Sequence, residues 1–148
     1  MIVRRTSVFP ANRQTVFLKL QSLETLQDVA APFATFEPIG NAAPVWTAGS
    51  TTSYHFKLFG SIPFGTHTIH ITRFSEDGIT SREGNEHVPV WNHEIHLEPL
   101  GAENTEYTDT VDIRAGWKTV FVWLWACAFY AHRQRKWIRR LKEEENKC

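Results

Sequence analysis

The sequence contains very little sulfur. Of its 148 residues, two are cysteine and one is methionine. The cysteines, Cys127 and Cys148, are about 21 positions apart on or just beyond one expected helix, which separates them by roughly 30 Å. That distance excludes a disulfide between them. A single methionine is also atypical of an adaptable, Met-rich binding surface. Two unpaired cysteines favour a reducing, cytoplasmic compartment.

The chain also lacks an excess of charge and a long apolar segment. Sixteen Lys and Arg balance sixteen Asp and Glu, so there is no general attraction to nucleic acid or to an anionic membrane. The longest apolar run, Val120 to Ala131, has about a dozen residues, whereas a membrane span needs about twenty. Met1 to Thr6 lacks the apolar stretch of an export signal. We therefore expect no nucleic-acid partner, no stable membrane insertion and a cytoplasmic location.

Aromatic residues, by contrast, are abundant. They make up 13% of the chain, including six Trp and ten Phe. Such rigid side chains suit the walls of a core or pocket. The length suits one domain over residues 1–148, which can bury about two thirds of its unfolded surface in a single core.

Hydrophobic periodicity predicts an α+β order of elements. A strand over Ile2 to Phe9 precedes two short helices, which begin after the capping residues Asn12 and Ser22. A loop is expected over 40–50. Alternating apolar residues predict an edge strand at 33–39 and further strands at 52–59, 66–74, 79–85, 91–98 and 105–114. Gly116 marks the change to a helical period, and a long C-terminal helix is expected over about 116–143.

This order of elements resembles the START-like superfamily, also called SRPBCC, birch-pollen-allergen-like or helix-grip. Four segments look like an uncharacterised bacterial branch of it, namely Ser81 to Asn85, Trp91 to Ile95, Tyr107 to Asp109 and Phe129 to Trp137. The resemblance implies a curved antiparallel sheet of about six or seven strands, wrapped around the long helix, with two short helices after the first strand. It also implies a hydrophobic cavity. Members of the superfamily include lipid carriers, polyketide cyclases or dehydrases, and aromatases.

The hairpin at 91–114 contains a candidate chemical pair. Alternation puts His93 on the same face as Trp91, and Asp109 on the same face as Tyr107. A turn near Gly101 places His93 opposite Asp109 or diagonal to it, within roughly 8 Å. The two could form an orienting pair for general acid/base chemistry, with Tyr107 as a nearby donor. They could equally be a satisfied polar pair that fixes strand register, and this is the interpretation that we favour.

Other charged residues give weaker signals. Either Glu83 or Arg82 should point inward, because neighbours on a strand face opposite ways, although solvated charges at the edge are the interpretation that we favour for this pair. The seven histidines do not form a convincing metal site, since i,i+3 pairs on a strand diverge, and we expect no metal and no cofactor. The basic segment from His132 to Lys142 could touch anionic lipid, but a solvated helix end is the favoured interpretation.

Three functional hypotheses follow. The first is binding of a hydrophobic small molecule, of lipid, polyketide or aromatic type, between sheet and helix. The second is a cyclase, dehydratase or hydrolase that uses His93, Asp109 and Tyr107. The third is an interaction protein with a filled core, whose Trp-rich surface forms a homodimer. Whether the protein is an enzyme is left open. The expected cavity lining is Tyr54, Phe56, Ile69, Glu83, Trp91, His93, Tyr107, Asp109, Val120 and Trp123.

Overall fold

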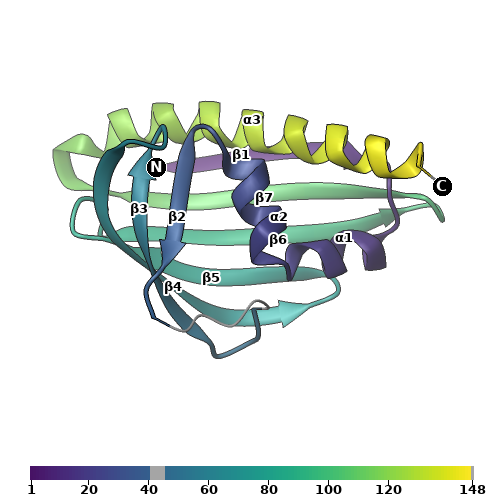
Figure 1. Ribbon diagram of the computed structural model, residues 1–148, viewed down its shortest axis with the longest axis horizontal. Helices are drawn as coiled ribbons and strands as arrows, with labels where there is room; N and C mark the ends of the chain where they lie inside the picture. The colour runs from purple at the N-terminus through teal and green to yellow at the C-terminus, as the bar shows by residue number, and fades with distance from the viewer. Residues whose placement is uncertain (41–45, 148) are drawn as a thin grey trace.

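The computed structural model describes residues 1–40 and 46–147, and its elements follow the predicted order (Figure 1). The expected loop over 40–50 is therefore only partly described, and Cys148 lies outside the described residues. The elements are β1 (Ile2–Phe9), α1 (Arg13–Leu20), α2 (Leu23–Ala30), β2 (Ala34–Pro38), β3 (Thr51–Leu58), β4 (Ile62–Ser75), β5 (Gly78–Gly84), β6 (Val90–Leu100), β7 (Asn104–Arg114) and α3 (Thr119–Glu145). A short 3-10 turn, Gly116–Lys118, leads into α3.

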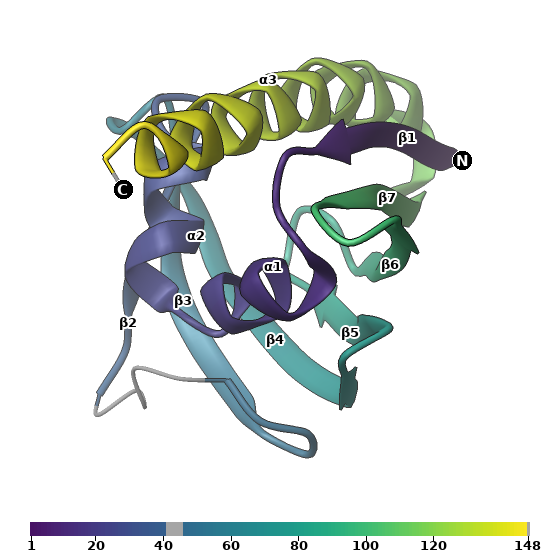
Figure 2. The same cartoon turned by 90° about the vertical axis from the view of Figure 1, so that its right-hand side faces the viewer.

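The seven described strands form one antiparallel sheet in the order β1-β7-β6-β5-β4-β3-β2. Its register shifts between His55 and Lys57 in β3, and between Ile71 and Arg73 in β4. Bulges of this kind bend a strand and increase its twist. The sheet is strongly curved, and α3 lies across its open side (Figure 2). The predicted α+β helix-grip fold, with its curved sheet, long terminal helix and two short helices, is confirmed.

The two short helices connect opposite edges of the sheet. They follow β1 at one edge and lead into β2 at the other. Asn12 caps α1 by accepting a hydrogen bond from the Thr15 amide at 2.8 Å, and Ser22 caps α2 by accepting one from the Thr25 amide at 3.4 Å. Both caps are those predicted. Each satisfies a backbone donor that the first helical turn leaves unpaired.

Strand β6 shows how the two faces of the sheet differ. Odd-numbered side chains from Trp91 to Leu97 are buried, and even-numbered ones from Asn92 to His96 are exposed. The concave face is therefore the core face, and the convex face meets water. His93 pairs with Val111 of β7, which places it diagonal to Asp109, as the predicted register allows.

Helix α3 runs along the length of the molecule and packs against β1, α2 and β7 (Figure 1). Its second half buries Tyr130, Gln134, Trp137 and Leu141, which recur every three or four residues and share one face. None of the helices in residues 1–40 and 46–147 has the length and apolar character needed to cross a membrane.

The start of α3 and the turn before it leave apolar side chains exposed. Trp117 is 81% exposed, and Val120, Phe121 and Leu124 are each more than half exposed. Val120 was expected on the face toward the cavity, whereas Phe121 and Leu124 belong to the second apolar face of the helix that the sequence pattern indicates. Its proposed cover, a second copy of the chain, stays a prediction.

Candidate functional site

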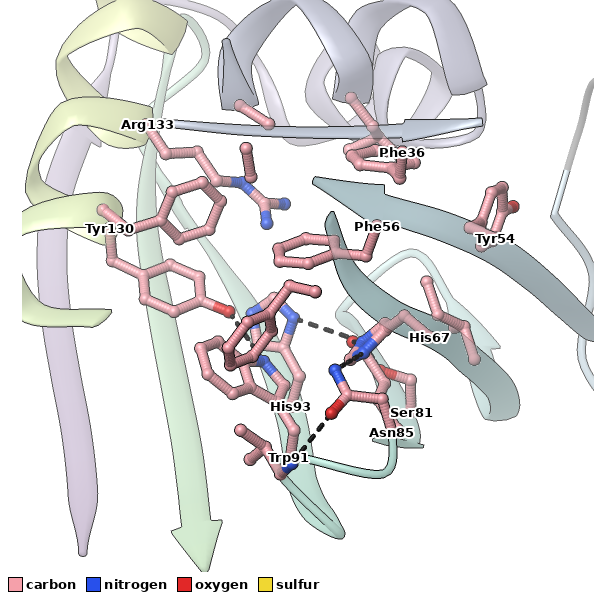
Figure 3. Close-up of a pocket in the computed structure, with 18 of the residues that line it drawn as sticks. Phe36, Tyr54, Phe56, His67, Ser81, Asn85, Trp91, His93, Tyr130 and Arg133 are labelled. Atoms are coloured by element: carbon pink, nitrogen blue, oxygen red, sulfur yellow. Dashed lines mark hydrogen bonds and ion pairs between the residues drawn. The ribbon is translucent and has the colours of Figure 1, made fainter. Parts of the chain in front are cut away.

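A cavity lies between the concave face of the sheet, α2 and α3 (Figure 3). The enclosed cavity has a volume of about 100 Å³. The wider space that reaches its mouth, including solvent at the opening, is about 960 Å³. Much of the wall is aromatic, formed by Phe36, Trp46, Tyr54, Phe56, Phe64, Trp91, Trp125, Phe129 and Tyr130. Such an apolar enclosure with a few polar groups is typical of small-molecule sites.

Trp125 of α3 joins the helical wall of the cavity to the wall formed by the sheet. Its ring stacks on Phe129 with centroids 4.9 Å apart, and it meets Trp91 and Phe56 at 6.2 and 6.5 Å with steep interplanar angles. Aromatic pairs prefer these offset and edge-on arrangements. The rings therefore support one another and keep the cavity wall rigid.

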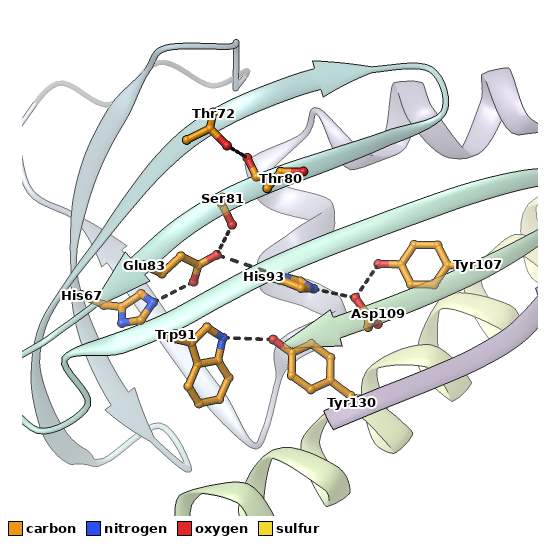
Figure 4. Close-up of polar contacts among 10 residues, drawn as sticks. All are labelled: His67, Thr72, Thr80, Ser81, Glu83, Trp91, His93, Tyr107, Asp109 and Tyr130. Atoms are coloured by element: carbon orange, nitrogen blue, oxygen red, sulfur yellow. Dashed lines mark hydrogen bonds and ion pairs between the residues drawn. The ribbon is translucent and has the colours of Figure 1, made fainter. Parts of the chain in front are cut away.

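Asp109 is fully buried behind the cavity wall and accepts three hydrogen bonds, of which Figure 4 draws those from His93 and Tyr107. Its Oδ1 accepts from Nε2 of His93 at 2.7 Å and from the hydroxyl of Tyr107 at 3.3 Å. Its Oδ2 accepts from Nε2 of Gln134 on α3 at 2.9 Å. An ionised carboxylate can only accept, so Nε2 of His93 carries a hydrogen. The carboxylate thus ties β6, β7 and α3 together.

Glu83 is a second carboxylate on the same face of the sheet, and its side chain is 10% exposed. It accepts from Nε2 of His67 at 2.9 Å and from the Ser81 hydroxyl at 2.6 Å, and its Oε1 lies 3.9 Å from Nδ1 of His93 (Figure 4). Its neighbour Arg82 is exposed, so Glu83 is the member of that pair that points inward. His93 consequently faces a carboxylate at each ring nitrogen.

The tautomer of His67 follows from its neighbours. Oδ1 of Asn85 accepts from the amides of His87 and Val88, both at 2.8 Å, which fixes the orientation of the side-chain amide. Nδ2 of Asn85 then faces Nδ1 of His67 at 3.4 Å and donates to it. Nε2 of His67 carries the hydrogen that Glu83 accepts.

The polar network decides the ionisation of both carboxylates. Burial raises the pKa of Asp109, but the hydrogen bond from His93 and the charge of Arg133 outweigh it, and the pKa lies below its ordinary value of 3.8. Burial likewise raises the pKa of Glu83, and His67 and His93 outweigh it, so this pKa lies below 4.5. Both groups are anionic at neutral pH.

The two tyrosines beside the network remain protonated. Burial raises the pKa of Tyr107 well above its usual range, and the charge of Asp109 raises it further. Burial is also the main reason why the pKa of Tyr130 is raised. The Tyr130 hydroxyl accepts a hydrogen bond from Nε1 of Trp91 at 3.2 Å, which joins α3 to β6.

One cation projects from α3 toward this space. The side chain of Arg133 extends toward the cavity near Tyr130 (Figure 3), and its Cζ lies 5.7 Å from the centroid of the Tyr130 ring. Burial lowers the pKa of Arg133, but interactions with Tyr107 and Asp109 outweigh it and raise the pKa above its ordinary value. The guanidinium therefore stays charged.

The expected cavity residues fall into three groups. The first lines the cavity and comprises Tyr54, Phe56, Ile69, Glu83, Trp91 and His93. Tyr107 and Asp109 form the second group, since both are fully buried and lie behind His93 instead of facing the cavity. Val120 and Trp123 form the third group, and they lie away from it. Their expected roles in ligand binding or catalysis stay predictions.

For the first half of α3, the prediction of which side of the helix lines the cavity was wrong. Val120 is 51% exposed, and Nε1 of Trp123 donates to the carbonyl of Ile2 at 2.9 Å, so Trp123 covers β1. Val122 and Trp125 line the cavity instead. The first half of α3 is apolar on nearly every side, so periodicity alone does not select the face that meets the cavity.

Arg133 is the most important residue that the sequence interpretation missed. It belongs to the basic segment 132–142, which was interpreted as a solvated helix end, and this is incorrect for Arg133. Its neighbour Arg135 is exposed, whereas Arg133 lines the cavity. The available signal was its spacing, because Arg133 follows Phe129 by four residues and Tyr130 by three, on the apolar side of the helix.

Solved structures share this fold at low sequence identity. A START superfamily protein from Mycobacterium smegmatis has a TM-score of 0.74 and 12% identity, with 96% of this chain and 97% of that chain covered. The Zhui aromatase/cyclase from Streptomyces sp. R1128 has a TM-score of 0.72 and 14% identity, with 96% and 93% covered. DynU16, from the dynemicin biosynthetic locus, has a TM-score of 0.64 and 21% identity, with 95% and 47% covered.

These similarities establish the START-like fold, as the sequence resemblance predicted, and identities this low establish the fold alone. No curated protein matches the chain at a significant level. A family described as a domain of unknown function, DUF8410, matches residues 7–141. Because this match includes β2 to β7, the end of β1 and most of α3, the chain belongs to the DUF8410 family, and its fold is START-like.

Proposed function

We propose that this protein binds a hydrophobic small molecule in the cavity between the sheet and α3. The observation that carries the proposal is the cavity itself, which is walled by aromatic rings from four strands and a helix. A core built only for stability would be filled, since protein interiors pack with few voids larger than water. Proteins with the same fold include one named as a START superfamily protein and one named as an aromatase/cyclase.

The geometry favours binding over catalysis by His93. A general base needs a ring nitrogen within hydrogen-bond reach of the substrate. In His93, Nε2 donates to Asp109 at 2.7 Å and Nδ1 faces Glu83 at 3.9 Å, so both nitrogens are directed at carboxylates of the protein. Asp109 also accepts from Tyr107 and Gln134. These contacts support the interpretation that the pair fixes the arrangement of β6, β7 and α3.

Native mass spectrometry of protein purified without detergent tests the proposal directly. We expect a fraction of the protein to carry a co-purified small molecule. The neutral dye N-phenyl-1-naphthylamine, which fluoresces in apolar surroundings, provides an affinity measurement that does not depend on the natural ligand. Binding to the wild-type protein should saturate with one dye per chain.

Two substitutions on α3 localise the binding site. Val122→Trp adds a large ring to the cavity wall and should weaken dye binding about tenfold or more, because the ring occupies the ligand space. Val120→Trp is the matched control, two residues earlier on the exposed side of the helix. It should leave dye affinity unchanged. Equal effects of the two variants, or no saturable binding to the wild type, would contradict the proposal.

A further inference from the structure

Arg133 presents a charge to the cavity without a close countercharge. In the part of the chain that the structure describes, no carboxylate oxygen lies within 4.0 Å of its guanidinium, and its buried Nε has no hydrogen-bond partner. The side chain is directed toward the space bounded by Phe36, Phe56 and Tyr130 (Figure 3). A buried cation is costly unless it is paired and hydrogen-bonded. The empty protein therefore leaves the guanidinium incompletely hydrogen-bonded, although Tyr107 and Asp109 stabilise its charge at longer range.

The two nearby carboxylates already have other partners. Asp109 accepts from His93, Tyr107 and Gln134. Glu83 accepts from His67 and Ser81, which lie on the strands of the sheet. Their charges help to keep Arg133 protonated, yet neither forms an ion pair with it within 4.0 Å. The guanidinium also interacts with the Tyr107 hydroxyl, but it forms no ion pair in the described residues and extends toward the cavity.

We propose that Arg133 receives the carboxylate of a compact aromatic acid bound in the cavity. This inference rests on the proposed binding function and specifies the class of ligand. A guanidinium presents parallel N–H donors that match the two oxygens of a carboxylate. The aromatic body would lie among Phe56, Trp125 and Phe129. The charge of Glu83, which lines the cavity on the side of the sheet, opposes an anion there and favours its binding at Arg133 on α3.

The size of the cavity limits the ligand. Its enclosed part of about 100 Å³ is somewhat smaller than a cavity of about 150 Å³ that accepts benzene. The enclosed part therefore holds about one aromatic ring, and a larger ring system must extend into the wider space of about 960 Å³ that reaches the mouth. Nε1 of Trp125, which is buried without a hydrogen-bond partner in the described residues, is a second donor at the cavity wall.

A pair of isosteric probes tests the inference. Naphthalene-2-carboxylate and naphthalene-2-carboxamide have the same shape but differ in charge, and their affinities can be measured by isothermal titration calorimetry at neutral pH. The wild-type protein should bind the carboxylate about tenfold or more tightly than the carboxamide, the difference expected for a charge-assisted hydrogen-bonded pair. Arg133→Met keeps the length of the side chain and should abolish this preference, with carboxamide affinity within about threefold of wild type.

Two further variants make the result interpretable. Arg135→Met removes a neighbouring but exposed cation and should leave the preference intact. Arg133→Lys keeps the charge without the planar donor pair and should bind the carboxylate with intermediate affinity. The ligand-free Arg133→Met protein should stay folded and melt only slightly below the wild type, since the guanidinium forms no ion pair within 4.0 Å and is stabilised only at longer range by Tyr107 and Asp109.

The outcomes separate this inference from the function on which it rests. If the wild type binds both naphthalene probes equally, and Arg133→Met changes neither affinity, the cavity binds apolar molecules but the acid-binding role of Arg133 is rejected. If neither these probes nor N-phenyl-1-naphthylamine binds, the proposed function fails and this inference fails with it. A large fall in the melting temperature of ligand-free Arg133→Met would assign Arg133 a structural role and overturn the proposal.

Discussion

One hydrogen bond, from Nε1 of Trp91 to the hydroxyl of Tyr130, connects β6 to α3 beside the cavity. Tyr130→Phe removes the acceptor and leaves Nε1 of Trp91 buried without a partner. We expect the free energy of unfolding to fall by about 1–3 kcal/mol, the cost of one unsatisfied buried group. Urea denaturation measures this change. A double-mutant cycle with Trp91→Phe should show a coupling energy of about 1 kcal/mol, and additive effects would contradict the role of this bond.

At the residue scale, the sequence predicted positions along the last hairpin better than positions around the helix. The arrangement of His93 and Asp109 follows from alternation and from the place of one turn, and a one-residue slip would expose the whole apolar face. The hydrogen bond between them at 2.7 Å could be expected from the register. The position of Arg133 at the cavity could not be expected in this way, because a charged side chain in a basic segment is usually solvated. Only the tertiary packing shows that this side chain faces a cavity.

Helix α3 depends on Gln134 for its connection to the sheet. The side chain is fully buried, donates to the carbonyl of Arg5 at 2.9 Å and to Asp109 at 2.9 Å, and accepts from the Ser7 hydroxyl at 2.5 Å. It therefore connects α3 with both β1 and β7.

Gln134→Leu keeps the approximate size of the side chain but removes these three bonds. We expect a loss of about 2–4 kcal/mol in the free energy of unfolding, since the groups on β1 and β7 lose their partners. Chemical denaturation followed by tryptophan fluorescence gives the value. Arg135→Ala, at the next and exposed position, should stay within about 0.5 kcal/mol of the wild type. A similarly small effect of Gln134→Leu would show that these bonds contribute little.

At the scale of elements, the order and bounds were predicted well, whereas the orientation of α3 was predicted only in part. The terminal helix was expected over about 116–143, and the structure has the turn Gly116–Lys118 followed by Thr119–Glu145. The predicted face containing Tyr130 and Trp137 is buried. The continuation of this face toward Val120 is not buried. In the apolar first half of the helix, one side faces the cavity, another packs on β1, and a third is exposed.

The whole molecule encloses two carboxylates in its core, and this has a consequence for its acid stability. The folded-state pKa values of Glu83 and Asp109 lie below their ordinary values of 4.5 and 3.8. The unfolded chain therefore takes up protons at higher pH than the folded protein does. The stability that these carboxylates provide is fully present above about pH 5, and it is lost as the pH falls through the folded-state pKa values.

Asp109→Asn separates this effect from general acid unfolding. At pH 7 the variant should be less stable by about 2–4 kcal/mol, because it removes the buried charge that His93 and Arg133 face. Between pH 5 and pH 3, however, its stability should fall less steeply than that of the wild type, since it has lost one of the two carboxylates whose protonation opposes folding. Urea midpoints measured across this range give both slopes.

Glu94→Gln is the matched control, because Glu94 is exposed on the opposite face of β6 from His93. Its pH profile should run parallel to that of the wild type. Glu83→Gln should flatten the profile as Asp109→Asn does, since its carboxylate is also buried and hydrogen-bonded. If Asp109→Asn and Glu94→Gln instead gave the same slope as the wild type, the acid sensitivity would arise from the surface charges, and the buried network would not control the pH range in which this fold is stable.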